Sequence, residues 1–170
     1  VDADGRILTG AGDMGRVARI DVAGLDPRLS ESRIVVATDV SSPLSGPHGA
    51  ARMFARQKGA DHAAVEVLEQ RLEAWDAALA PHFGRPVSSI PGTGAAGGFA
   101  APLIALGIGD IRSGADEIAD AIGLDHAVAN SDIVIVGEGC LDAQSLQGKG
   151  PIALARRAAA AEAMVVALCG

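Results

Sequence analysis

The sequence predicts an α/β protein in which a largely parallel sheet is flanked by helices. Two apolar runs, at residues 33–38 (RIVVAT) and 133–136 (IVIV), are typical of strands that are buried on both faces. Segments with helical spacing of apolar residues lie between these runs, and such alternation is typical of a parallel sheet. Only 2% of the residues are aromatic although 49% are hydrophobic, so the core must consist mainly of small aliphatic side chains.

Residues 1–60 form the first of two expected parts of the chain. Turn signals occur at residues 4–5 (DG) and 26–27 (DP), and we expect a short strand between them at residues 16–22. The apolar strand at residues 33–38 follows, and Asp39 comes directly after it. A loop with several glycines then continues to Gly59. We expect Asp39 to lie at the carboxyl end of its strand, where ligands of α/β proteins gather.

Residues 61–170 form the second expected part, which contains most of the α/β pattern. Asp61 is positioned to cap a helix that continues to about Leu79, with apolar residues on one face and charged residues such as Glu69 on the others. The further elements, in order, are a short strand at 86–90, a glycine-rich turn at 91–98 that opens an apolar helix, a capping box formed by Ser113 and Asp116, a helical turn from Asp125, the strand at 133–136, a helix at 151–161 and a last strand at 164–169.

Charge and hydropathy exclude several classes of partner. The net charge is −7, so no basic stripe is available for a phosphate backbone, and we expect no nucleic acid as the main partner. The longest uncharged run, residues 92–109, contains Pro102 and many glycines and predicts neither a membrane span nor a signal peptide. The two cysteines, Cys140 and Cys169, form no metal or disulfide pattern, which favours a cytoplasmic protein.

The loop after the second apolar strand, residues 137–150 (GEGCLDAQSLQGKG), is the richest candidate site. It holds two carboxylates, Glu138 and Asp142, and the ammonium group of Lys149 at the start of a helix. A carboxylate after a strand can bind Mg²⁺ or accept a proton from a substrate hydroxyl, and both Asp39 and Asp142 stand in such places. Taken together, these groups are the parts that phosphoryl transfer uses. Taken singly, each acid also fits a turn or a helix cap, and Lys149 a solvated loop charge.

Two segments resemble nucleotide-binding motifs, but neither has all the features that its motif requires. Residues 92–97 (GTGAAG) match G-x-G-x-x-G, but Pro91 interrupts the preceding strand and Asp110 precedes a polar turn, so a Rossmann site is disfavoured. The loop also fails as a P-loop, because Gln144 stands in place of the first glycine and Gly150 in place of the hydroxyl residue. Two interpretations of the glycine-rich turn stay open, namely anion binding by its amides and tight helix packing alone.

Four segments, in this order, resemble the bacterial type of glycerate kinase. They are residues 37–44 (ATDVSSPL) with 49–50 (GA), residues 57–60 (QKGA), residues 91–98 (PGTGAAGG), and the loop with GEG, LDAQS and GK. Their order and spacing agree over roughly residues 20–170. The resemblance implies part of a two-domain glycerate kinase-like fold, and we expect the chain to be truncated at both ends.

The resemblance also implies an activity and a role for each candidate residue. ATP would donate its γ-phosphoryl group to a hydroxyl of glycerate, with Mg²⁺, in a cleft between two α/β domains. Asp39 would act as a base or a metal-anchoring acid, and Lys149 would be the second catalytic residue. The metal would be held by Glu138 and Asp142. The residues implied in binding phosphate or the substrate carboxylate are Arg56, Lys58, Gly92, Gly94, Gly97 and Gly98.

Departures from the family pattern keep other functions open. Cys140 stands where such proteins tend to carry Arg, and Ala55 and Arg56 replace a usual Gly-Pro pair, so Arg56 is a candidate substitute cation. We expect the 170 residues alone not to turn over. A second hypothesis is a non-catalytic module that binds a small organic acid or a nucleotide at residues 92–98. A third is a dinucleotide-binding oxidoreductase domain, which the weak strand before Gly92 disfavours.

Overall fold

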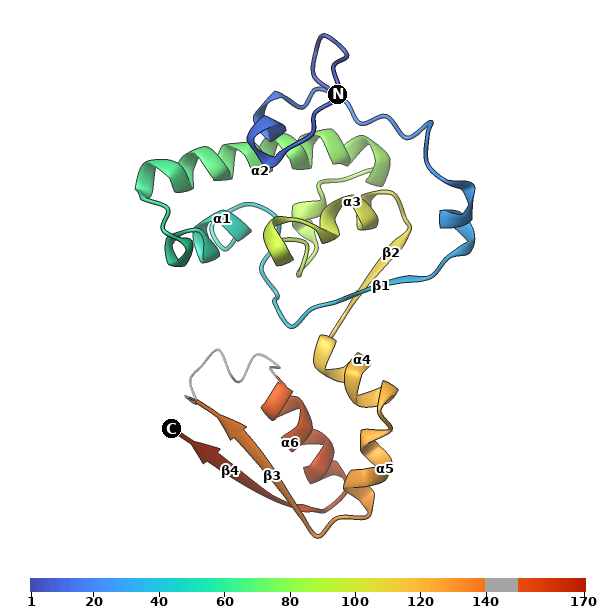
Figure 1. Cartoon of the computed structure of the whole chain (residues 1–170), viewed down its shortest axis with the longest axis vertical. Coiled ribbons are helices and arrows are strands. Elements are labelled where there is room, and N and C mark those ends of the chain that lie inside the picture. Colours follow the sequence, from blue (N-terminus) through green and yellow to red (C-terminus); the bar gives the residue numbers. More distant parts are fainter. Residues whose placement is uncertain (140–149) are drawn as a thin grey trace. The chain divides into compact units, whose positions relative to one another are not determined.

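The computed structural model describes residues 1–139 and 150–170, and these divide into two compact units (Figure 1). Unit 1 comprises Val1–Val36 and Val40–Ile111, and unit 2 comprises Ala37–Asp39 and Arg112–Gly170. These units differ from the division after residue 60 that we expected from the sequence, because the helix that follows residue 61 packs with the residues before it.

Unit 1 is organised around one long helix, α2 (His62–Phe83). As the sequence predicts, Asp61 caps it, since its Oδ1 accepts the amide of Ala64 at 2.8 Å. Gly84 ends it in the left-handed conformation, with φ of 79°. Two shorter helices, α1 (Ala50–Phe54) and α3 (Ala100–Ala105), pack against α2 (Figure 1). The 3-10 turns of this unit are η1 (Ala11–Arg16), η2 (Pro27–Glu31), η3 (Arg56–Lys58), η4 (Val87–Ser89) and η5 (Ala95–Gly97).

The core of unit 1 consists of small aliphatic side chains, as the composition requires. Leu44, Leu79 and Val87 are fully buried and form one cluster with Leu72 and several alanines. Burying each leucine contributes about 1.5–3 kcal/mol to folding. Leu44 belongs to the loop after the first strand, so this core fixes the loop against α2.

Two short strands, β1 (Ile34–Ala37) and β2 (Gly109–Arg112), pair as one two-stranded sheet. The sequence predicts β1 within one residue at each end. It does not predict β2, because Asp110 and Arg112 alternate with apolar neighbours in a segment that we interpreted as a polar turn. The chain passes between the units within these two strands, after Val36 and after Ile111, and also after Asp39.

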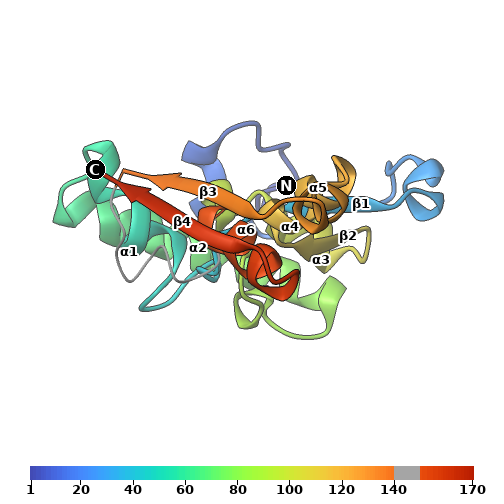
Figure 2. The ribbon, with the colours of Figure 1, turned by 90° about the horizontal axis from the view of Figure 1, so that it is seen from below.

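Unit 2 contains a parallel pair of strands with helices packed on it. In β3 (Ile133–Glu138) and β4 (Met164–Cys169), Ile133 pairs with Met164 and Glu138 with Cys169. Helix α6 (Gly150–Ala160) packs against both strands, and α4 (Gly114–Ala121) and α5 (Leu124–Ala129) pack against α6 (Figures 1 and 2). Parallel strands flanked by helices confirm the predicted α/β class, although the described strands form two sheets.

The prediction that β3 is buried on both faces is wrong for the described residues. Val136 is buried, and Val134 packs with Val128 and Ala158 under the helices. Ile133 and Ile135 point the other way and are 53% and 63% exposed. Successive side chains of a strand alternate between faces, so an unbroken apolar run does not tell which face is covered.

Two expected strands are replaced by turns. In the first of them, Arg16 ends η1 and residues 17–22 are irregular chain, held because the amides of Ala18 and Arg19 donate to the carbonyl of Val1 at 3.0 and 3.2 Å. Residues 86–90 contain η4, which is held by a buried carboxylate on α2, since the amide of Val87 donates to Asp76 Oδ1 at 2.7 Å. Apolar content alone does not make a strand when the backbone finds other partners.

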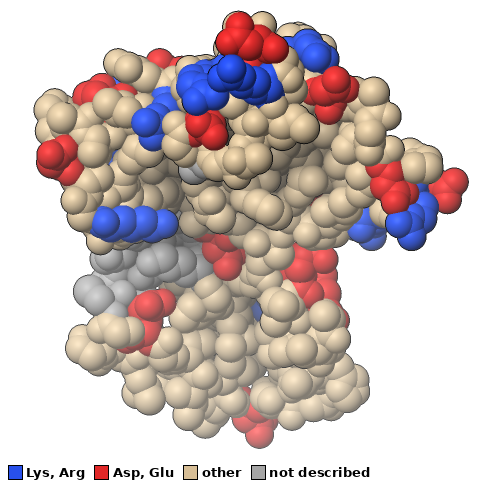
Figure 3. All heavy atoms as spheres, turned by 45° about the horizontal axis from the view of Figure 1, so that its top comes forward, with Lys and Arg blue, Asp and Glu red and all other residues tan. Residues whose placement is uncertain are grey.

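Surface charge and helix hydropathy agree with the sequence composition. In the view of Figure 3, acidic and basic side chains are interspersed and much of the surface is uncharged. Among the helices that the structure describes, none combines the length and hydropathy needed to cross a bilayer.

Candidate functional site

Two loops of unit 1, residues 41–49 and 91–98, are joined by backbone hydrogen bonds. The amides of Gly92 and Gly94 donate to the carbonyls of Ser41 and Ser42, at 3.2 and 3.0 Å. A Cβ atom on Gly94 would lie 2.2 Å from the carbonyl oxygen of Pro43. Only glycine allows the two backbones to approach so closely.

Thr93 holds the same two loops together from within the core. It is fully buried, and its Oγ1 accepts the amide of Leu44 at 3.0 Å and donates to the carbonyl of Ile90 at 2.8 Å. A single threonine among glycines carries no sequence signal of this kind, so the sequence analysis missed it.

Glu69 of α2 supports the loop at residues 41–49 from the other side. The sequence pattern placed it on a charged, solvated face of the helix, whereas it is only 2% exposed. Its Oε1 accepts the amide of Gly46, and Arg52 Nε lies 4.0 Å from its Oε2. Within the described part of the chain, Oε2 has no hydrogen-bond partner.

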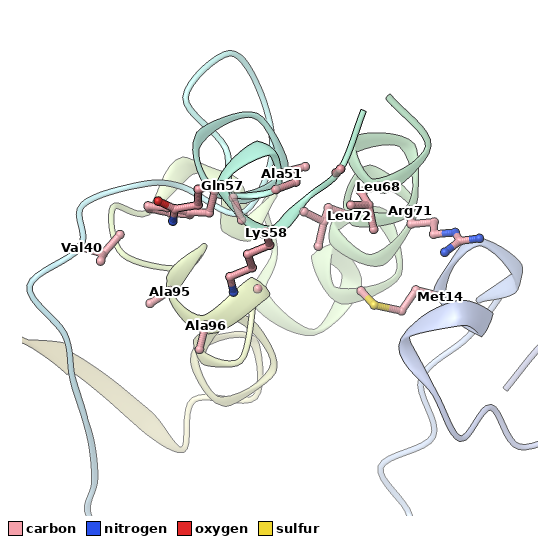
Figure 4. A pocket seen from close by; sticks show the side chains of 15 residues that line it. Met14, Val40, Ala51, Gln57, Lys58, Leu68, Arg71, Leu72, Ala95 and Ala96 are labelled. Atoms are coloured by element: carbon pink, nitrogen blue, oxygen red, sulfur yellow. The ribbon is translucent and has the colours of Figure 1, made fainter. Parts of the chain in front are cut away.

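A cavity of about 570 Å³ opens in unit 1 beside the glycine-rich turn (Figure 4). Lys58 and Gln57, from η3, line one side, and Ala95, Ala96 and Gly97 line another. The rest of the lining is mostly apolar. In Figure 4 the ammonium group of Lys58 points toward the turn, whereas the guanidinium of Arg71 points away from it, toward η1. The structure thus places Lys58 and Gly97 in the lining of one cavity. Neither their spacing in the sequence nor the composition could show this.

The turn has an unusual backbone where it lines the cavity. Ala96 has φ of 50° and ψ of 36°, and Gly97 and Gly98 follow with φ of 73° and 96°. A left-handed conformation costs a residue with a Cβ atom about 1–2 kcal/mol. Such strained residues concentrate at functional sites, and Ala96 lies on the cavity wall toward which Lys58 points.

Most amides of the turn are already occupied. Besides those of Gly92 and Gly94, the amides of Gly97 and Gly98 donate to the carbonyls of Gly94 and Ala95, at 3.2 and 3.1 Å. A Cβ atom on Gly98 would also meet Leu44 Cδ1 at 2.6 Å. Tight packing, one of the two interpretations left open by the sequence, therefore explains Gly94 and Gly98, and Gly92 has a φ of 86° that favours glycine. Anion binding by these amides stays a prediction.

Asp39 belongs to unit 2 and is exposed. Its Oδ1 accepts the amide of Ala115 at 3.1 Å and the hydroxyl of Ser113 at 3.3 Å. Ser113 is the N-cap of α4, as predicted, because its Oγ accepts the amide of Asp116 at 3.2 Å. The carboxylate therefore lies at the first turn of α4, an arrangement that the sequence analysis did not foresee.

A cluster of charges ties the three helices of unit 2 together. Arg157 of α6 contacts Asp116 and Asp120 of α4 at 2.9 and 2.8 Å, and Asp125 of α5 at 2.9 Å. The hydrogen bond from Arg157 holds the pKa of the Asp116 carboxyl below its ordinary value of 3.8, and the three carboxylates raise the pKa of the guanidinium. One arginine thus fixes the position of α4 on α6.

The other expected site residues are not brought together by the structure. Arg56 is exposed in η3 and does not line the cavity that the next two residues line. Glu138 is half-buried at the end of β3 in unit 2. Asp142 and Lys149 lie outside the described residues, as does Cys140.

A possible Mg²⁺ site has to be judged on the chemistry of its donors. Within residues 1–139 and 150–170, no three His, Cys, Asp or Glu side chains are grouped to hold a metal ion. Mg²⁺ in phosphoryl-transfer sites commonly takes one or two carboxylates and completes its shell with phosphate oxygens and water. Glu138, a carboxylate at the end of a parallel strand, fits that requirement.

Comparison with known proteins decides the family. A model of the glycerate kinase family matches residues 1–170. The chain belongs to the glycerate kinase family. This finding confirms the assignment drawn from four short segments of the sequence.

Individual relatives agree with this family. The chain is 38% identical over 170 residues to the glycerate 2-kinase of Escherichia coli K12, covering 99% of this chain and 45% of that protein. It is 44% identical over 172 residues to the "Uncharacterized protein Mb2228c" of Mycobacterium bovis, covering 95% of this chain and 45% of that protein. A solved structure, of a protein assigned as glycerate kinase 2 from Salmonella typhimurium LT2, matches with a TM-score of 0.79 and 38% identity, covering 99% of this chain and 46% of that one. The chain thus spans a little under half the length of these relatives.

Proposed function

We propose that the gene product containing this chain is a glycerate kinase, which transfers the γ-phosphoryl group of ATP to a hydroxyl of glycerate. The observation that carries the proposal is the family match over the whole chain, supported by several relatives that are named glycerate kinases. Asp39 and Lys58 offer two of the groups that this reaction needs, a base and an anion contact.

Asp39 is proposed as the catalytic base. Phosphoryl transfer to an alcohol needs a group that accepts the hydroxyl proton and orients the attacking oxygen. Among the described residues, both donors to Asp39 contact Oδ1. Oδ2 is then the oxygen that would accept the proton from glycerate, while Oδ1 keeps the carboxylate in place.

Lys58 is proposed as the anion contact. Its ammonium group points from η3 toward the turn that carries Ala96 (Figure 4). Lys58 is exposed, and its positive charge attracts a carboxylate or a phosphate that enters the cavity. Arg56 and Gly97 are proposed as secondary contacts of the same ligand, together with Gly92, Gly94 and Gly98.

Mg²⁺ and ATP complete the proposed reaction. Bound Mg²⁺ neutralises charge on the transferred phosphoryl group. Glu138 and Asp142 are proposed to hold it, and Lys149 is proposed as a further cation for the phosphates. By this assignment a cytoplasmic enzyme uses two small-molecule substrates, and nucleic acids and membranes are not required.

A coupled assay of ADP release by the complete gene product, with Mg-ATP and glycerate, tests this function. We expect turnover that Asp39→Asn lowers by about 10²–10⁴-fold, the usual contribution of general base catalysis. Ser131→Ala is a matched control, because among the described residues the Ser131 hydroxyl donates to the carbonyl of Ala127, at 2.8 Å, and not to a candidate site residue. Glycerate-dependent ADP release that is no greater in the wild type than in Asp39→Asn would contradict the proposal.

A non-catalytic binding module is the second candidate, favoured by the volume and apolar lining of the cavity. Calorimetry with glycerate and with Mg-ATP separates the two, because binding without glycerate-dependent turnover of the complete product would support the module. The same assay on the isolated 170 residues tests our expectation that they do not turn over. A dinucleotide-binding domain gains no support, since the segment before Gly92 contains η4 (Val87–Ser89) and not the strand that this motif requires.

A further inference from the structure

The position of Asp39 depends on a helix far from it in the sequence. Its two hydrogen-bond donors, the Ser113 hydroxyl and the Ala115 amide, come from residues 74 and 76 positions later. Both belong to the first turn of α4. Because Asp39 is exposed, packing does little to restrict its side chain, and these two hydrogen bonds set its orientation.

The start of α4 lies close to the end of β1. A Cβ atom on Gly114 would lie 3.4 Å from Asp39 Oδ2 and 3.5 Å from the amide nitrogen of Thr38. Both distances are those of ordinary van der Waals contact, so the start of α4 lies directly beside the end of β1. A shift of α4 along or across this contact has to move the donors of Asp39 with it.

Ser113 connects the carboxylate to the helix through one hydroxyl group. Its oxygen accepts the Asp116 amide at 3.2 Å, and its proton is donated to Asp39 Oδ1 at 3.3 Å. A hydroxyl has one proton to give. Since that proton goes to Asp39, the same group caps α4 and orients the carboxylate.

Arg157, on helix α6, holds the first turn of α4 through Asp116. The Asp116 that donates its amide to Ser113 also accepts Arg157 Nη2 at 2.9 Å and Nε at 3.3 Å. The side chain of Arg157 is only 19% exposed, and its neighbour Ala158 is fully buried in the core of unit 2. The guanidinium is therefore an anchored group, which the planar geometry of arginine suits.

We propose that Ser113 and Arg157 are positioning residues, which hold Asp39 in place through the chain of contacts from Arg157 to Asp116 to Ser113. Ser113 acts directly on the carboxylate, and Arg157 acts by fixing the first turn of α4. The kinetic consequence rests on the proposed function of Asp39 as base. The structural consequence, a fixed hydrogen bond between Asp39 and Ala115, does not depend on that function.

Two substitutions of Ser113 separate positioning from helix capping. Ser113→Gly keeps a residue that N-cap positions accept and adds no charge, but it has no hydroxyl to donate to Asp39, whereas Ser113→Thr keeps the hydroxyl. In the complete gene product we expect Ser113→Gly to lower kcat by about 10–100-fold, the usual effect of a misplaced catalytic group. KM for ATP and the melting temperature should stay close to those of the wild type. Ser113→Thr should retain most of kcat, and Ser131→Ala is the control.

A spectroscopic readout follows the hydrogen bond without any assay of activity. The amide proton of Ala115, bound to a carboxylate, should resonate downfield in the NMR spectrum and move upfield in Asp39→Ala. We expect a smaller upfield shift of the same signal in Arg157→Gln. Arg156→Gln is the control: it removes an equal charge from an exposed position, and the Ala115 signal should not shift.

The outcomes distinguish this inference from the proposed function. Wild-type kcat in Ser113→Gly, or an unchanged Ala115 signal in both Asp39→Ala and Arg157→Gln, overturns the positioning role even when the kinase activity is confirmed. Equal glycerate-dependent activity in the wild type and in Asp39→Asn overturns the proposed function, while the Ala115 signal still decides whether Arg157 fixes the contact.

Discussion

The carbonyl oxygen of Pro43 lies 2.2 Å from the place that a Cβ atom on Gly94 would occupy. This contact joins the loop that follows Asp39 to the glycine-rich turn, and the amide of Gly94 reinforces it by donating to Ser42. The two loops can keep this arrangement only if position 94 carries no side chain. The role that these contacts show for the glycine-rich turn is therefore the packing of the two loops.

Gly94→Ala should destabilise the protein by about 1–3 kcal/mol or more, the usual cost of overpacking, because the new methyl group meets backbone that cannot turn aside. Urea unfolding, followed by circular dichroism, measures the change. Gly10→Ala is the matched control, since Gly10 has an extended backbone and no atom within 4 Å of its Cβ position. Equal stability of the two variants would show that the loops are not packed as described.

Thr93→Val should cost about 1–3 kcal/mol of folding free energy, because the Leu44 amide loses its acceptor in a buried place. Valine has nearly the shape of threonine, so the loss reports the hydroxyl and not a cavity. Thr93→Ser keeps the hydroxyl and should lose less. Chemical denaturation of both variants measures the difference, and a Thr93→Val protein at least as stable as Thr93→Ser would contradict this role.

Lys58→Ala should raise KM for the anionic ligand by about 10-fold or more, the effect of losing one charge-assisted contact. Arg56→Ala should have a smaller effect, because Lys58 lines the cavity and Arg56 does not. Initial rates at varied glycerate and varied ATP show which ligand depends on the ammonium group. A larger effect of Arg56→Ala would favour the sequence-based idea that Arg56 is the substitute cation.

Arg157 should stabilise the protein in a pH-dependent way. The folded-state pKa of Asp116 is depressed, so its ion pair contributes stability above the ordinary value of 3.8 and loses it as the pH falls below 3.8 through the folded-state pKa. We expect Arg157→Gln to have a lower melting temperature than the wild type at pH 6. The difference should shrink below pH 3.8.

Salt and a neighbouring arginine provide the controls for that experiment. High salt should also reduce the difference, since the three aspartates are largely exposed. Arg156→Gln removes the same charge from the next position and should change the melting temperature less. A difference between wild type and Arg157→Gln that stays constant from pH 6 to pH 3 would point to lost packing and not to the ion pairs.

Features whose signals lie close together in the chain could be predicted from the amino-acid sequence. Asp61 caps α2 through an amide three residues away, and Ser113 caps α4 in the same way. The apolar runs predicted β1 and β3, and the four family segments predicted the glycerate kinase family. Local backbone preferences and short motifs are readable because the residues that satisfy each other are neighbours.

The contacts of the candidate site residues could not be predicted in this way, because they join distant parts of the chain. Gly46 is bound by Glu69, Leu44 by Thr93 and Asp39 by Ser113, across separations of 23, 49 and 74 residues. A sequence pattern assigns Glu69 to a solvated helix face and cannot show that a loop covers it. The glycines at 92–98 look alike in sequence, yet packing occupies most of their amides and leaves Gly97 on the cavity wall. Which residues meet depends on how distant segments pack, and that is settled only when the core around Leu44 and Leu79 is formed.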